Sequence, residues 1–218
     1  MPSFSFSPVS TTRSVRLGVE FVLIFFGGPL LILAAHKAGL LFGMLWGAAL
    51  LIWLISGQQE PVRHDGRREV ATIFRRFAVL APIIALLTWV LSPQTFFQLP
   101  RERPVFWLVI MVLYPLLSVW PQEMLYRRFL FARYAPLFRS QPALVLASAV
   151  SFGFAHVMFL NWIAVSMTLI GGFLFARDYA RHRSVFLACV EHSLYGCLVF
   201  TLGLGRFFYT GAAWHGHG

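Results

Sequence analysis

Seven apolar runs constrain this chain more than any other feature of its sequence. They cover residues 17–35, 40–55, 77–91, 105–120, 142–159, 162–176 and 185–204. A helix that crosses a bilayer needs about 20 apolar residues, and shorter runs must recruit neighbouring residues to cross. We therefore expect an all-α, polytopic membrane helix bundle with about seven to eight transmembrane helices.

Composition supports a lipid environment. Of the 218 residues, 58% are hydrophobic and 12% are charged, whereas a soluble domain is about 45–50% apolar and about 25% charged. The net charge of +10 does not indicate a nucleic-acid partner, because the basic residues lie between the apolar runs and do not form one basic face. We expect the lipid bilayer as partner and no nucleic acid.

The basic residues also predict an orientation. With seven spans and a cytoplasmic N-terminus, 14 of the 18 Lys and Arg residues fall on the cytoplasmic side, as the positive-inside rule requires. We expect an integral protein of the plasma (inner) membrane. Residues 1–16 are expected to form a short cytoplasmic segment, residues 17–210 a single transmembrane domain, and residues 211–218 a flexible tail.

Three costly polar residues lie at or inside separate apolar runs. Glu123 follows the run 105–120, His156 lies in 142–159, and His192 lies in 185–204. Arg127 is four residues after Glu123, so the two share a helix face and can pair. Ionisable groups in a membrane normally face the bundle interior and mark function. We predict that Glu123, His156 and His192 line one polar cavity.

The depth of Glu123 leaves two alternatives open. In the seven-span arrangement Glu123 lies at the cytoplasmic end of its span, while His156 lies late in a span that runs outward. Residues after Pro121 either continue as a buried or re-entrant helix that brings Glu123 deeper, or form an eighth crossing over 121–138 that inverts the later loops.

The three motifs resemble a known family. Gln122-Glu123-x-x-x-Arg127, Phe152-x-x-x-His156 and the later His192 are similar to the signature motifs of the CPBP family. That family comprises CAAX proteases, including the type II CAAX prenyl endopeptidase, and bacteriocin-processing or self-immunity proteins. The resemblance covers the C-terminal half, about residues 105–209. It implies a membrane-embedded, glutamic-type peptidase that requires no metal.

Two positions depart from the family pattern. The family usually has two adjacent glutamates in its first motif, the first of which activates water, and Gln122 stands in that place. The family commonly has an asparagine four residues after the last histidine as an oxyanion donor, and Gly196 stands there. If the scaffold is a weakened peptidase, Gln122→Glu and Gly196→Asn are expected to raise its activity.

Three functions therefore compete. The first is an intramembrane endopeptidase with Glu123, His156 and His192 as catalytic residues, supported by Gln122, Arg127, Phe152 and Gly196. It would cleave a peptide or protein substrate, with or without a lipid anchor. The second is a zinc site, since two histidines and a glutamate are zinc ligand types. The third is a non-catalytic binding or immunity protein that retains the fold. Metal analysis and a peptide panel distinguish them.

Overall fold

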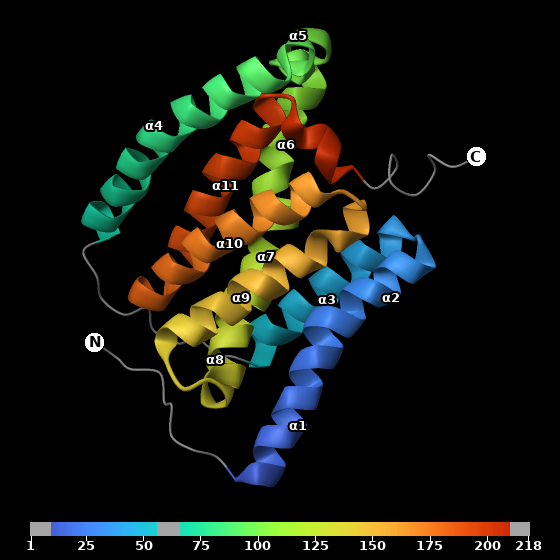
Figure 1. Ribbon diagram of the computed structural model, residues 1–218, viewed down its shortest axis with the longest axis vertical. Helices are drawn as coiled ribbons and strands as arrows, with labels where there is room; N and C mark the ends of the chain where they lie inside the picture. Colours follow the sequence, from blue (N-terminus) through green and yellow to red (C-terminus); the bar gives the residue numbers. More distant parts are fainter. Residues whose placement is uncertain (1–9, 56–65, 210–218) are drawn as a thin grey trace.

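The computed structural model describes residues 10–55 and 66–209, and over these ranges the chain is helical without strands (Figure 1). Six helical segments are long and apolar enough to cross a membrane, and the shorter apolar helix Val185–Thr201 is a seventh. The predicted all-α polytopic bundle is confirmed. Expectations for residues 1–9, 56–65 and 210–218 lie outside the described residues.

The elements follow one another with short connections. The N-terminal half contains α1 (Thr11–Val22), the π-helical turn η1 (Leu23–Gly27), α2 (Gly28–Ala35), α3 (Ala38–Ile55), α4 (Gly66–Leu91), η2 (Pro93–Thr95) and α5 (Gln98–Glu102). The central segment contains α6 (Pro104–Tyr114), η3 (Pro115–Val119), α7 (Trp120–Glu123), η4 (Met124–Phe129), α8 (Leu130–Tyr134) and η5 (Ala135–Leu137). The C-terminal part contains α9 (Gln141–Ala155), η6 (His156–Phe159), α10 (Trp162–His182), α11 (Val185–Thr201) and η7 (Leu204–Phe208).

The central segment continues as one helix past Glu123. It is helical throughout its 34 residues, Pro104–Leu137, about 50 Å at 1.5 Å per residue and longer than the hydrocarbon core of about 30 Å. A wide π-helical turn begins at Pro115, where the missing N–H interrupts the α-helical hydrogen bonds. Glu123 therefore lies inside a continuous helix and not at its end. The continued helix is confirmed, and the eighth crossing is wrong.

Helices α9 and α10 pack closely as an antiparallel pair (Figure 1). A Cβ atom added at Gly172 would lie 3.0 Å from Cδ1 of Phe152 and 3.4 Å from Cα of Ala149. Small residues let membrane helices approach in this way, so Gly172 allows close contact between α9 and α10. The Asn161 side chain caps α10 by accepting a 2.8 Å hydrogen bond from the Ala164 amide.

The protein core lies where α8 and α9 meet the N-terminal helix. Phe25, Phe131, Tyr134 and Phe152 are all at most 1% exposed, and their rings are among the aromatic contacts that join these elements. Helix α4 is different, because side chains such as Trp89 are more than half exposed. Figure 1 shows α4 at the outer edge of the bundle, where its apolar surface is suited to lipid.

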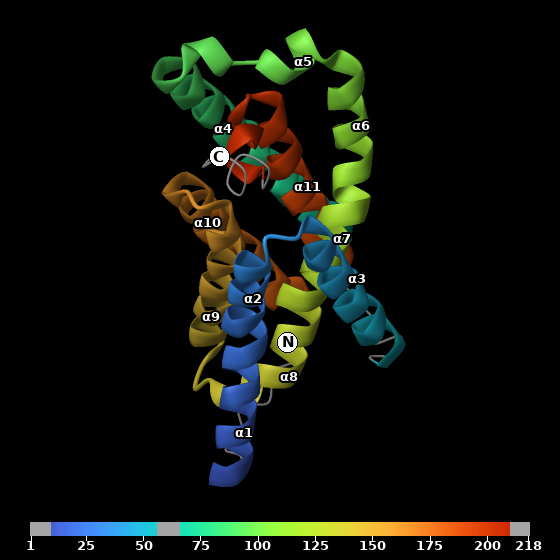
Figure 2. The same ribbon diagram turned by 90° about the vertical axis from the view of Figure 1, so that its right-hand side faces the viewer.

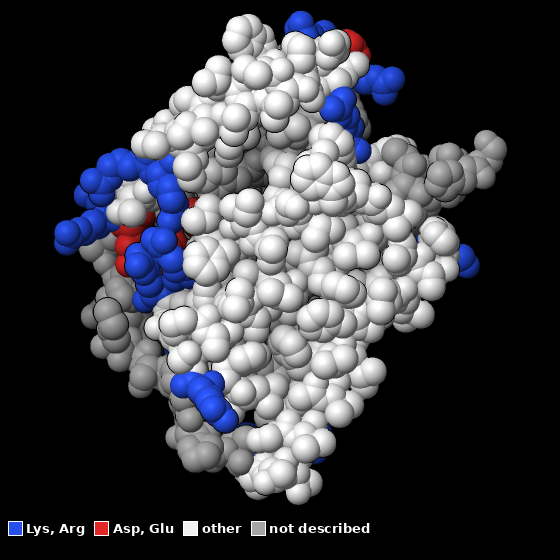
Figure 3. Space-filling model, viewed as in Figure 1, with Lys and Arg blue, Asp and Glu red and all other residues white. Residues whose placement is uncertain are grey.

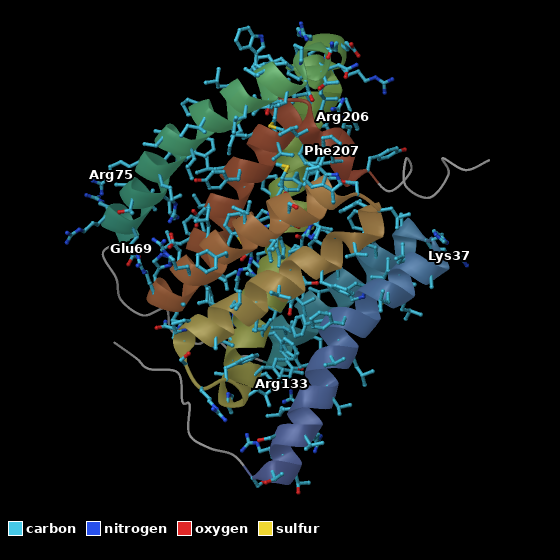
Figure 4. The ribbon with its side chains drawn as sticks, viewed as in Figure 1. Lys37, Glu69, Arg75, Arg133, Arg206 and Phe207 are labelled. Atoms are coloured by element: carbon cyan, nitrogen blue, oxygen red, sulfur yellow. The ribbon has the colours of Figure 1, made fainter. Side chains whose placement is uncertain are left out.

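Charged residues collect at opposite ends of the molecule. Figure 3 shows Lys and Arg gathered at the periphery, with an uncharged surface between them. Figure 4 places Glu69, Arg75 and Arg133 along the left and lower edges, and Lys37 and Arg206 along the right and upper edges. An uncharged zone between two charged ends is the surface expected of a protein that crosses a bilayer.

Candidate active site

Glu123 is the buried carboxylate at the centre of the site. It ends α7 and is 0% exposed. Its Oε2 lies 3.1 Å from Nε of Arg127, which confirms the predicted pair. Its Oε1 lies 2.8 Å from Nδ1 of His192 on α11. Both carboxylate oxygens are therefore engaged by side chains, one from its own helix and one from a distant helix.

His192 joins three helices. Its Nδ1 contacts Glu123, and its Nε2 lies 3.0 Å from the hydroxyl of Tyr114 on α6. The Phe175 ring stacks on the imidazole at 4.8 Å with an interplanar angle of 21°. A carboxylate only accepts hydrogen bonds, so Nδ1 carries the proton and, in the neutral imidazole, Nε2 accepts from the Tyr114 hydroxyl. The result is a carboxylate–imidazole–hydroxyl chain.

Arg127 is fixed on several sides. Its Nη1 donates to Oγ of Ser148 on α9 over 2.9 Å, and that hydroxyl donates in turn to the Tyr126 carbonyl over 2.8 Å. The guanidinium lies 4.9 Å above the Phe152 ring, a favourable cation–π arrangement. Because Arg127 is 0% exposed, it acts as an internal counter-charge for Glu123.

His156 lies on the other side of Phe152. Its Nδ1 donates to the Phe152 carbonyl over 2.7 Å, so Nε2 is the nitrogen that carries the lone pair. The Phe152 ring centre is 4.9 Å from the His156 ring and 5.5 Å from the His192 ring. The structure thus joins Glu123 to His192 directly and places His156 beside them through Phe152. One cavity shared by all three residues stays a prediction.

The two departures from the motif pattern have distinct surroundings. The Gln122 amide donates to Oγ of Ser118 over 2.7 Å, along its own helix. Gly196 packs against the Tyr114 ring so closely that an added Cβ would overlap the ring. An asparagine at position 196 would therefore require the Tyr114 ring to move, and the expected gain of activity from Gln122→Glu and Gly196→Asn stays a prediction.

Sequence reasoning missed Tyr114, Ser148 and Phe175. Tyr114 carries a hydroxyl inside an apolar run, whereas tyrosines of membrane helices concentrate at the interfaces. This unusual position could have marked Tyr114 as a candidate site residue. Ser148 lies among other small residues on α9, and nothing in the sequence marks its contact with Arg127. Phe175 resembles any lipid-facing or core aromatic residue.

A second ionic cluster lies nearby on the same helix. Arg76 on α4 pairs with Asp178 on α10 and with Glu191 on α11. Glu191 is 0% exposed and precedes His192, yet it points to Arg76, as the helical angle between neighbouring residues predicts. This cluster ties the peripheral helix α4 to the bundle.

The alternative of a zinc site finds no ligand set in residues 10–55 and 66–209. No group of three or more His, Cys, Asp or Glu side chains in these ranges is arranged to hold a metal ion. Both ring nitrogens of His192 have hydrogen-bond partners, in Glu123 and Tyr114.

Comparison with known families identifies the segment that holds the site. The model of the family described as type II CAAX prenyl endopeptidase Rce1-like matches residues 104–198. This segment of the chain is similar to the Rce1-like family. It runs from the start of α6 through most of α11 and contains Glu123, His156 and His192. Comparisons with curated proteins and with solved structures gave no match.

The Rce1-like assignment confirms the resemblance drawn from the three motifs. Together with the six apolar helices, it indicates an integral membrane protein with a segment similar to a protease family. The chemistry of the site and the identity of the substrate are matters for a proposal.

Proposed function

We propose that this protein is an intramembrane endopeptidase that hydrolyses a peptide bond at the Glu123–His192–His156 site. One observation carries the proposal. Two buried side chains from separate helices, Glu123 and His192, form a 2.8 Å hydrogen bond inside the segment that matches an endopeptidase family. Burying ionisable side chains within a membrane bundle costs free energy, and such residues therefore usually mark a functional site.

The roles follow from the hydrogen bonds. Attack of water on an amide needs a base and a donor for the developing oxyanion. Glu123 is the carboxylate of this glutamic-type site, and because both its oxygens are engaged it acts through His192 by fixing the tautomer and orientation of the imidazole. His156 presents Nε2 as the base that takes a proton from the attacking water. That proton passes to the amine nitrogen as the C–N bond breaks.

An apolar groove beside the site supports the proposal that the substrate is lipidated. The groove has a volume of about 1120 Å³. Its lining includes Pro115, Met124 and Ser193, which directly follow Tyr114, Glu123 and His192 in the chain. We propose that it holds the hydrocarbon chain of a lipidated peptide while the peptide reaches the site. Cleavage of matched prenylated and unmodified peptides tests this, and equal rates would contradict it.

The proposed orientation has a cytoplasmic N-terminus in the plasma (inner) membrane. Cysteines placed at Gln98, between α4 and α6, and at Arg139, between α8 and α9, test it in intact cells. An impermeant maleimide is expected to label position 98 at once and position 139 only after permeabilisation. The reverse pattern would overturn the orientation.

A non-catalytic binding or immunity protein is the second candidate. The observation that favours it is Gln122, an amide that bonds to Ser118 and cannot act as a base. Purified protein in liposomes, incubated with a peptide panel with and without a chelator, distinguishes the candidates. Cleavage that survives chelation supports the proposed endopeptidase, cleavage lost with bound zinc supports a metalloenzyme, and no cleavage supports the binding protein.

A further inference from the structure

Tyr114 enters the site from a helix that carries none of the motif residues. It ends α6, which packs against α11 (Figure 2). Its hydroxyl lies 3.0 Å from Nε2 of His192, and its ring meets the Phe200 ring edge to face at 5.2 Å. Tyr114 also keeps some exposed surface, whereas Glu123 and Arg127 have none.

Gly196 makes this approach possible. It lies on α11 four residues after His192, and a Cβ atom there would overlap Cε1, Cζ and the hydroxyl oxygen of Tyr114. Glycine is the residue that permits so close an approach to a helix backbone. The Tyr114 ring therefore occupies the space that a side chain at position 196 would fill, and it delivers a hydroxyl to the same imidazole.

Two other donors of the site, on Arg127 and His192, are held inside the protein. Arg127 is held by Glu123 and Ser148 and has no exposed surface. The Nδ1–H group of His192 donates to Glu123. A phenol hydroxyl rotates to suit its partner, so the Tyr114 hydrogen can turn from Nε2 of His192 to a third atom.

We propose that Tyr114 is a further catalytic residue, the donor that stabilises the oxyanion of the peptide bond under attack. As water adds to the carbonyl carbon, the electron pair of the C=O bond moves to oxygen, which accepts a hydrogen bond from the Tyr114 hydroxyl. In the resting site the same hydroxyl donates to Nε2 of His192, and it turns to the oxyanion as the negative charge develops there. This role rests on the proposed peptidase function.

The first test removes the hydroxyl alone. Tyr114→Phe is expected to lower kcat about 10²–10³-fold, the usual cost of losing one oxyanion donor. KM should stay unchanged, because the donor acts mainly on the transition state. Tyr179→Phe is the matched control. Tyr179 lies on α10 and is buried against Phe131, so this variant should keep wild-type kinetics. Thermal unfolding in detergent checks that both variants are folded.

The second test moves the donor to α11. Gly196→Asn alone should lower the unfolding temperature, and Tyr114→Ala alone should lower kcat. The double variant Tyr114→Ala/Gly196→Asn should be better folded than Gly196→Asn and more active than Tyr114→Ala. Strictly additive unfolding temperatures would contradict the shared space, and this readout does not depend on activity.

The outcomes separate the two claims. Wild-type kcat in Tyr114→Phe, with Tyr179→Phe also active, overturns the role of Tyr114 and leaves the peptidase function intact. A wild-type protein that cleaves no peptide removes the peptidase function, and the role of Tyr114 with it.

Discussion

Two ionic clusters lie inside this bundle, and they differ in what their charges contact. Glu123 and Arg127 come from one helix, are both 0% exposed, and extend through His192 to Tyr114. Arg76 comes from α4, its side chain is 18% exposed, and it ends on two carboxylates, Asp178 and Glu191. Both clusters neutralise buried charge, but only the first contains an imidazole between a carboxylate and a hydroxyl.

The difference shows that burial of charge alone does not mark chemistry. Imidazoles exchange protons readily near neutral pH, so a series of hydrogen-bonded side chains that includes His192 can move a proton. An arginine between two carboxylates fixes three helices in place and offers no such step. We infer that the first cluster performs the reaction and that the second fastens α4, whose other side chains mostly face lipid.

The largest effect on folding is expected for Arg127→Ala. The substitution leaves the Glu123 carboxylate buried without its counter-charge, and breaking such a pair costs about 3–5 kcal/mol. Thermal unfolding and yield in detergent measure the loss. Arg139→Ala, at an exposed position, is the control and should change stability by less than about 0.5 kcal/mol. Wild-type stability of Arg127→Ala would show that the pair is not buried in solution.

A smaller effect is expected for Arg76→Ala. Hydrogen bonds to charged groups contribute about 1.5–3 kcal/mol, so the unfolding temperature should fall while kcat per folded molecule stays near wild type. Arg75→Ala is the matched control, because the hydrogen bonds that Arg75 makes to the described residues lie within α4. A folded Arg76→Ala protein without activity would break the distinction between the two clusters.

The smallest effect is expected for Ser148→Ala. It removes one hydrogen bond to Arg127 and one to the Tyr126 carbonyl, each contributing about 0.5–1.5 kcal/mol. Ser151→Ala, one turn along α9, is the control, because the Ser151 hydroxyl has no hydrogen-bond partner among the described residues. Equal stability of the two variants would mean that Ser148 does not support Arg127.

The sequence predicted the helices better than their ends. Apolar runs located the spans because lipid requires them, but the segment after Pro121 was ambiguous since Arg127 and Arg133 interrupt the apolar pattern. Arg133 is neutralised by Glu20 on α1, a contact that the pattern does not reveal. A charge paired within the protein therefore looks the same in the sequence as a charge in solvent.

The candidate site was predictable where its residues lie close in the sequence. Glu123 and Arg127 are one helical turn apart, so their pairing follows from helix geometry. The contact between Tyr114 and His192 spans 78 positions and depends on α6 lying against α11 at a glycine. Helix packing of this kind cannot be derived from one sequence, which is why Tyr114 and Ser148 were missed.

The central claim is that His192, held by Glu123, takes part in hydrolysis of a peptide bond. Its most direct test is mass spectrometry of a peptide panel after incubation with the purified protein in liposomes made with ¹⁸O-labelled water. We predict cleavage with a single heavy oxygen in each new carboxylate, and none with His192→Gln at matched folding. Absence of cleavage by the wild type, or equal cleavage by His192→Gln, would contradict the claim.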